Sequence, residues 1–258
     1  MKFGLNLYSI RNLIDTNEKF LQTAKTLKEI GYSYMQCSAG LTYDPVQFKR
    51  ISEEADMPIV LTHAPLERLL NDTDKLMEEH TLFGCKNIGL GMLPIPMYSD
   101  EKECKETIDK LNVAAEKMAQ NGFKFFHHNH HYEFIRYGNE TLMDYMIKNT
   151  PYINFTLDTY WVQYGGVEVC DLLEKLKGRI ECVHLKDYKL EKVAERKYEP
   201  KFAPIGDGTM NYEKILAKMK DCGAKYFLVE QDNAADLPDT LGLVTRSIEY
   251  LNKNWGTK

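Results

Sequence analysis

The sequence has no long uncharged apolar run, no paired cysteines and no stretch of one charge, and each absence excludes a class of protein. Its apolar runs are too short to span a membrane, and the first residues, MKFGLNLYSIRNLID, lack the apolar core of a signal peptide. The six cysteines form no C-x-x-C pair, which predicts reduced thiols in a cytoplasmic protein. The net charge is −5, and acidic residues dilute the one basic cluster at 186–201, so we expect no nucleic-acid partner.

Short β-prone runs alternate with longer amphipathic stretches along the whole chain. The predicted strands are 2–8, 34–38, 58–63, 87–91, 123–130, 153–158, 180–185 and 226–231, and the predicted helices are 16–30, 45–55, 66–83, 100–121, 140–149, 168–177, 211–222 and 236–254. Eight strands, each followed by a helix, predict a closed (β/α)8 TIM barrel. An open doubly wound sheet would carry a glycine-rich turn after its first strand, and the turn LYSIRN has none. No linker divides the chain, so we expect one domain over residues 1–258.

Polar residues stand at the ends of the predicted strands, where a parallel barrel gathers its catalytic groups. These strand ends hold Tyr8, His63, the run His128-Asn129-His130, Asp158, His184 and Glu230. Asp158, His184 and Glu230, with one histidine of the fifth strand, come from four consecutive strands and should converge at one side of the barrel mouth. Mixed imidazole and carboxylate ligands suit a divalent metal such as Mn²⁺, Co²⁺, Fe²⁺ or Zn²⁺. A lone strand-end histidine is more often a scaffold residue, but this combination indicates a metal site.

The fifth strand presents two alternatives, because histidines occupy both of its faces. His128 and His130 share one face, while His127, Asn129 and His131 share the other. Apolarity does not choose between the faces, since helices cover the outside of the barrel as well. The loop that follows contains Glu133, which is either an acid, a base or a substrate contact, or a solvated carboxylate.

Several of these motifs, in this order, resemble the xylose isomerase-like TIM barrel superfamily and its sugar phosphate isomerase/epimerase group. They are THAP (62–65), HNHHYEF (128–134), LDTYWVQYGG (157–166), VHLKD (183–187), IGDG (205–208) and LVEQD (228–232). Relatives bind one divalent ion through Glu, Asp, His and Glu from strands five to eight. The resemblance implies that Asp158, His184 and Glu230 are ligands, and that His128 stands where the first glutamate is expected. It also implies that His128 and His130 face inward.

The resemblance implies a divalent-metal-dependent isomerase or epimerase that acts on a keto-sugar or related polyol through an enediolate, with Mn, Mg, Co or Zn as the ion. In the 3-epimerases two metal-bound glutamates are the paired bases, and this chain keeps only Glu230 of that pair. We therefore expect Glu230 as one base and His130, Glu133 or Lys186 as the second group. Lys186 should share a strand face with His184.

The expected substrate contacts are His63 and Tyr8, with Tyr160 and Trp161 as an apolar wall for a sugar ring or aglycone. The expected partner is a small-molecule sugar; relatives are often dimers, and the sequence argues neither for nor against a homodimer. A lyase or dehydratase remains open, because the same enediolate can expel water from an inosose or an aglycone from a 3-keto-glycoside. The acidic chain disfavours an abasic-site endonuclease, and a non-enzymatic sugar-binding barrel would leave the ligand set unexplained. Asp207 and Asp232 would repel a phosphate, which favours an unphosphorylated substrate.

Overall fold

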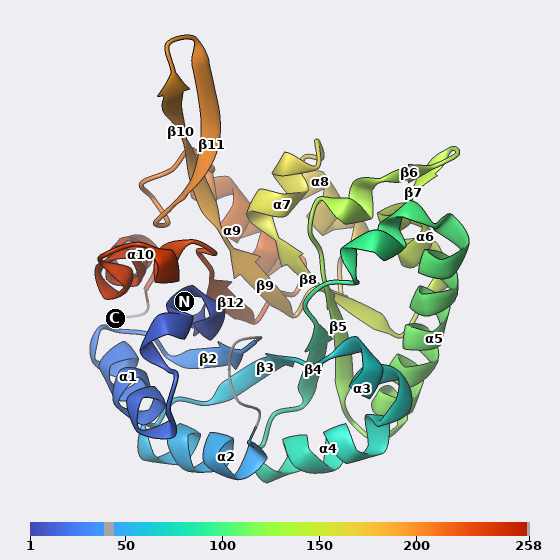
Figure 1. The fold of residues 1–258 in the computed structure, drawn as a ribbon, viewed down its shortest axis with the longest axis horizontal. Coiled ribbons are helices and arrows are strands. Elements are labelled where there is room, and N and C mark those ends of the chain that lie inside the picture. The colour runs from blue at the N-terminus through green and yellow to red at the C-terminus, as the bar shows by residue number, and fades with distance from the viewer. Residues whose placement is uncertain (39–43, 257–258) are drawn as a thin grey trace.

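Eight parallel strands close into a barrel in the computed structural model, which describes residues 1–38 and 44–256 (Figure 1). Around the barrel the strands follow the order β1-β12-β9-β8-β5-β4-β3-β2. Their bounds are β1 Phe3–Asn6, β2 Tyr34–Cys37, β3 Ile59–His63, β4 Asn87–Leu90, β5 Lys124–His128, β8 Ile153–Asp158, β9 Cys182–Leu185 and β12 Tyr226–Val229. The predicted TIM barrel is therefore confirmed.

An outer ring of helices covers the strands (Figure 1). The helices are α1 Asn17–Glu29, α2 Pro45–Glu54, α3 Leu66–Asn71, α4 Thr73–Leu82, α5 Glu101–Gln120, α6 Leu142–Asn149, α7 Thr159–Tyr164, α8 Val169–Lys175, α9 Tyr212–Asp221 and α10 Thr240–Trp255, with short 3-10 turns at Leu7–Leu13, Ile95–Ser99, Tyr132–Phe134 and Ala234–Asp236. The single helix predicted over 66–83 is wrong, because Asp72 has a non-helical backbone (φ −136°) and separates α3 from α4. None of the helices in the described ranges is both long and apolar enough to cross a membrane.

Several strands end earlier than the sequence predicts, and this places site residues just beyond them. The first strand stops at Asn6, whose side chain caps the turn that carries Tyr8. Strand β5 stops at His128 and β12, the eighth strand of the barrel, stops at Val229. His130 and Glu230 therefore lie in the loops that follow these strands. Loops at the carboxyl ends of barrel strands form the active-site face of this fold.

The packing of two phenylalanines shows which face of β5 points into the barrel. Phe126 packs with Leu61 and Leu228 in a small cluster within the barrel, whereas Phe125 belongs to the larger core between strands and helices. Side chains two residues apart share a strand face, so His128 points inward with Phe126 and His127 points outward with Phe125. All six cysteines lie in the described residues and are buried and free of disulfides.

A long hairpin projects from the barrel after β9, and the sequence-based assignment missed it (Figure 1). It consists of β10 Asp187–Ala194 and β11 Lys197–Ala203, paired antiparallel with Tyr188 opposite Phe202. The Asp187 carboxylate anchors its base by accepting the backbone N–H groups of Gly206 (3.0 Å) and Met210 (3.1 Å). A second, much shorter hairpin joins β6 Arg136–Tyr137 to β7 Glu140–Thr141.

Candidate metal centre and substrate cavity

Four buried side chains from consecutive barrel strands meet at the mouth. One ligand atom of each of His128, Asp158, His184 and Glu230 lies within 4.8 Å of the corresponding atom of the others. His184 Nδ1 is 2.9 Å from Glu230 Oε2, and His128 Nε2 is 3.4 Å from Asp158 Oδ2. The structure thus brings together the residues that the sequence proposed as ligands.

The two imidazoles are oriented so that each presents a lone pair to this centre. His128 Nδ1 donates to the carbonyl of Gly91 (3.0 Å), and His184 Nε2 donates to Oε1 of Gln36 (2.7 Å). A proton on those nitrogens leaves His128 Nε2 and His184 Nδ1 unprotonated and facing the centre. His184 Nδ1 is buried without a hydrogen-bond partner among the described residues. An outer hydrogen bond of this kind is how proteins orient metal-bound histidines.

Each of the two carboxylates is also oriented by a hydrogen bond, which one of its two oxygens accepts. Asp158 Oδ1 accepts the backbone N–H of Trp161 (3.0 Å) at the start of α7, which leaves Oδ2 for the centre. Glu230 Oε1 accepts a hydrogen bond from Asn6 Nδ2 (2.5 Å), and its Oε2 is the oxygen that lies beside His184 Nδ1. Four acceptor atoms that face one another in a buried site need positive charge beside them. Two imidazole nitrogens and two carboxylate oxygens fit a divalent metal ion.

Lys186 supplies part of the positive charge at this centre. Its ammonium is buried and lies 2.9 Å from Asp158 Oδ2, Glu230 Oε2 and Asp232 Oδ1. Burial alone would lower the pKa of Lys186, but the three carboxylates outweigh it and raise the pKa well above its usual range. Three carboxylates and one ammonium leave two surplus negative charges, which a divalent cation would neutralise.

Asp232 is a site residue that the sequence marked only as unfavourable to phosphate. Burial raises its pKa to about 6, against the opposing effect of Lys186. In Glu230 the effect of the neighbouring groups outweighs that of burial. Burial would raise its pKa, but Lys186 and His184 hold it well below its usual range. The sequence signal for Asp232 is its position two residues after Glu230, in the loop that follows β12.

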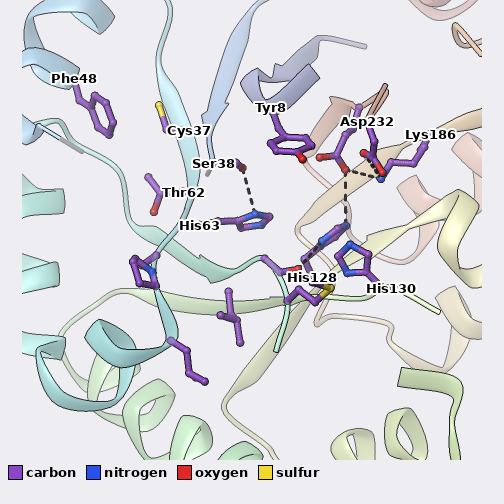
Figure 2. Close-up of a pocket in the computed structure, with 17 residues that line it drawn as sticks. Tyr8, Cys37, Ser38, Phe48, Thr62, His63, His128, His130, Lys186 and Asp232 are labelled. Carbon is purple, nitrogen blue, oxygen red and sulfur yellow. Dashed lines mark hydrogen bonds and ion pairs between the residues drawn. The ribbon is translucent and has the colours of Figure 1, made fainter. Parts of the chain in front are cut away.

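A cavity of about 600 Å³ opens beside the metal centre (Figure 2). Its lining combines polar and apolar residues: Tyr8, Cys37, Ser38, Phe48, Thr62, His63, Ala64, Pro65, Leu66, Leu90, Gly91, Met92, His128, His130, Lys186, Glu230 and Asp232. Among the substrate and catalytic residues that the sequence proposed, Tyr8, His63, His130, Lys186 and Glu230 line this cavity. A volume of this size is typical of a small-molecule site.

His63 joins the metal centre to the rest of the cavity. Its ring stacks 5.5 Å from the ring of His128, and its nitrogens lie near Ser38 Oγ (3.2 Å) and Gln36 Nε2 (3.1 Å). Burial, followed by the nearby His128, lowers the pKa of His63 well below its usual range, so the ring is neutral. Gln36 therefore contacts both His63 and His184, a bridging role that the sequence-based assignment missed.

Glu133 lies behind the cavity rather than in it. It is fully buried and accepts hydrogen bonds from Tyr98 Oη (2.6 Å), His127 Nε2 (3.0 Å) and the backbone N–H of His130 (2.7 Å). Burial would raise its pKa, but the hydrogen bond from His127 and the nearby His127 and His130 leave the pKa lowered. The carboxylate is thus placed to hold the loop that carries His130.

Tyr160 and Trp161 form an aromatic wall on the side of the hairpin. The Trp161 ring lies 5.2 Å from the ring of His130, and Lys186 Nζ lies 5.3 Å above it. Tyr160 packs against Phe202 of β11 (4.8 Å between ring centroids). These two residues support cavity-lining side chains but are not among the described residues that line the cavity.

Comparisons with known proteins agree with this architecture. The family model described as xylose isomerase-like TIM barrel matches residues 24–254. An inosose dehydratase of Clostridium perfringens is 26% identical over 242 residues, covering 80% of this chain and 80% of that protein. A crystal structure of a sugar phosphate isomerase/epimerase from Parabacteroides distasonis has a TM-score of 0.80 and 21% identity, covering 100% of this chain and 95% of that one. A xylose isomerase-like TIM barrel protein from Mycobacterium smegmatis, in complex with magnesium, has a TM-score of 0.72 and 13% identity. The match covers 99% of this chain and 96% of that one. The chain belongs to the xylose isomerase-like TIM barrel family.

Proposed function

We propose that the protein is a divalent-metal-dependent sugar isomerase or epimerase that acts on a keto-sugar or related polyol. The observation that carries this proposal is the cluster of His128, Asp158, His184 and Glu230, whose free ligand atoms converge within 4.8 Å at the edge of a substrate-sized cavity. The likeness to a solved sugar phosphate isomerase/epimerase supports it.

The four residues of the cluster would hold one ion, with Mn, Mg, Co or Zn as candidates. When bound, such an ion acts as a Lewis acid on the carbonyl oxygen and a neighbouring hydroxyl of the substrate. A solved protein of the same fold is in complex with magnesium, which supports a divalent ion as a ligand of this fold.

The residues around the cluster are placed for proton transfer at the carbon next to the carbonyl. We assign Glu230 as the group that takes this proton, while the electron pair moves onto the carbonyl oxygen and gives an enediolate. The buried ammonium of Lys186 lies beside Asp158 and Glu230 in the same centre, where its positive charge would stabilise the enediolate. Isomerisation follows when the proton is delivered to the former carbonyl carbon, while the hydroxyl proton of the first carbon moves to the former carbonyl oxygen. Epimerisation follows when a proton returns to the original carbon from the opposite face and the carbonyl re-forms.

His130 and Lys186 are the candidates for the second proton-transfer group, because both line the cavity. Glu133 does not reach the cavity, so we assign it the role of a positioning residue that holds the backbone of His130. His63 and Tyr8, which both line the cavity, are assigned as contacts to the hydroxyl groups of the substrate.

A dehydratase is the second candidate, and the match to an inosose dehydratase over 80% of both chains favours it. The first step is the same loss of a proton to Glu230. The electron pair then expels the hydroxyl group on the next carbon, and a proton from Lys186 allows that group to leave as water. Elimination and isomerisation therefore use the same site and differ in the substrate and the fate of the electron pair.

Incubation of the metal-loaded protein in D₂O with a panel of ketoses, inososes and keto-glycosides tests this proposal. Deuterium at the carbon next to the carbonyl, without loss of a substituent, is the result we expect for an isomerase or epimerase. Release of water or of an aglycone identifies the lyase instead. Absence of both deuterium and product across the panel, at full metal content, would count against either reaction.

A further inference from the structure

The cavity has two chemically different ends. Its polar end lies at the metal centre and includes His130, Lys186 and Asp232, which Figure 2 shows on one side of His63. Phe48 and Thr62 lie on the other side of His63, away from those charged groups (Figure 2). The cavity is therefore elongated, with His63 where its two ends join.

The second end is built from apolar side chains on the neighbouring strands and helices. Cys37 ends β2, Phe48 lies on α2, Ala64 lies between β3 and α3, Leu66 begins α3, and Leu90 ends β4. Cys37, Phe48 and Leu90 are each only 3% exposed and form its floor, whereas Leu66 is partly exposed at its rim. None of the described side chains at this end carries a charge at neutral pH.

This end does not suit a sugar ring or a phosphate. The hydroxyl groups of a sugar would lose water there and find few hydrogen-bond partners, which costs free energy. A phosphate needs basic groups, and Lys186 is the one lysine or arginine of the described lining, already paired with three carboxylates. An uncharged apolar group, in contrast, gains free energy by leaving water for such a surface.

The size of the cavity indicates that both ends are filled by one ligand. Its volume of about 600 Å³ lies in the range of cavities that enclose drug-sized ligands rather than a single sugar ring. We propose that the end formed by Cys37, Phe48, Ala64, Leu66 and Leu90 is an aglycone subsite. The substrate is then a keto-sugar joined to an uncharged aromatic or alkyl group. The apolar subsite stands on the cavity alone, and the sugar at the other end rests on the proposed function.

Calorimetric binding of three unreactive probes tests the subsite. Phenyl β-D-glucoside, methyl β-D-glucoside and phenol are titrated into the metal-loaded protein. Burial of the phenyl ring should make phenyl glucoside bind about tenfold more tightly than methyl glucoside. Equal affinity of the two glucosides would overturn the proposal, and so would phenol binding as tightly as phenyl glucoside, because the two ends would then not act as one site.

Two matched tryptophan variants locate the effect. Leu66→Trp fills the rim of the subsite and should abolish the preference for the phenyl glucoside while leaving methyl glucoside binding within twofold. Leu82→Trp makes the same change on the 52% exposed end of α4, outside the cavity, and should keep the preference. A phenyl preference that survives in Leu66→Trp would contradict the assignment.

The outcomes also separate this inference from the proposed function. If the two glucosides bind equally, the subsite is wrong, but the metal content and any deuterium exchange into a free ketose are unaffected. Failure of the proposed function leaves the phenyl preference and its loss in Leu66→Trp intact, without exchange or elimination in any keto-sugar.

Discussion

Gln36 on β2 accepts a hydrogen bond from His184 on β9, across the barrel, with 2.7 Å between Oε1 and Nε2. The bond fixes the tautomer of His184, so that its Nδ1 lone pair points at the metal centre. Removal of such an outer partner commonly costs 10- to 100-fold in metal affinity. We therefore expect Gln36→Leu to bind a divalent ion about 10 to 100 times more weakly in a competition titration with a chelating dye.

Two other glutamine variants control for this effect. Gln36→Glu keeps an oxygen acceptor and should retain metal affinity close to that of the unmodified protein. Gln22→Leu makes the same change as Gln36→Leu on an exposed position of α1 and should have no effect. Unchanged affinity in Gln36→Leu would show that this hydrogen bond does not orient a ligand.

The ligand assignment itself predicts which side chains are required for metal content. Asp158→Ala and His184→Ala each remove one of the four converging atoms, and both should lose most of their bound metal when measured by atomic absorption after gel filtration. Asp232→Asn changes a carboxylate that contacts Lys186 but is not in the cluster, so it should retain the ion. Full metal content in both alanine variants would remove the basis for the proposed function.

Much of the barrel could be predicted from the sequence, because the strand ends of a parallel barrel collect polar groups in a recognisable order. Asp158, His184 and Glu230 each follow an apolar run, and the structure brings them together with His128. Which face of β5 points into the barrel could not be predicted from the residues themselves, since Phe125 and Phe126 make both faces apolar. It depends on which phenylalanine packs inside the barrel, and that contact involves distant strands.

The supporting residues were harder to find than the ligands. Gln36 had a weak signal, as a polar residue in the middle of the apolar run YMQCS. The β10–β11 hairpin also had one, because Tyr188 and Leu190 alternate with Lys189 and Glu191 in the period of a strand. Its turn lacks the Asn-Gly or Asp-Gly pair typical of hairpins, so the segment was interpreted only as a diluted basic cluster.

Glu133 is expected to contribute to stability through the contacts it makes behind the cavity. Glu133→Gln replaces one carboxylate oxygen with an amide donor, so either Tyr98 and His127 or the backbone N–H of His130 loses its acceptor. An unsatisfied buried donor costs roughly 1–3 kcal/mol, and the free energy of unfolding measured in urea should fall by about that amount. Glu67→Gln, on the exposed first turn of α3, is the matched control and should be neutral. Equal stability of Glu133→Gln and the unmodified protein would mean that these contacts do not hold the loop.

His80 predicts a specific dependence of stability on pH. Its ring is buried, with Nε2 2.7 Å from Thr62 Oγ1 and Nδ1 2.6 Å from the carbonyl of Leu76, and burial lowers its pKa from 6.5 to about 4. Between those two values the unfolded chain binds a proton that the folded protein does not, so the free energy of unfolding falls as the pH falls from 6.5 to 4. The contribution of this one group is at most about 3 kcal/mol. In urea unfolding curves across this range, His80→Gln should show a shallower decline than the unmodified protein, and parallel declines in the two proteins would disprove the assignment.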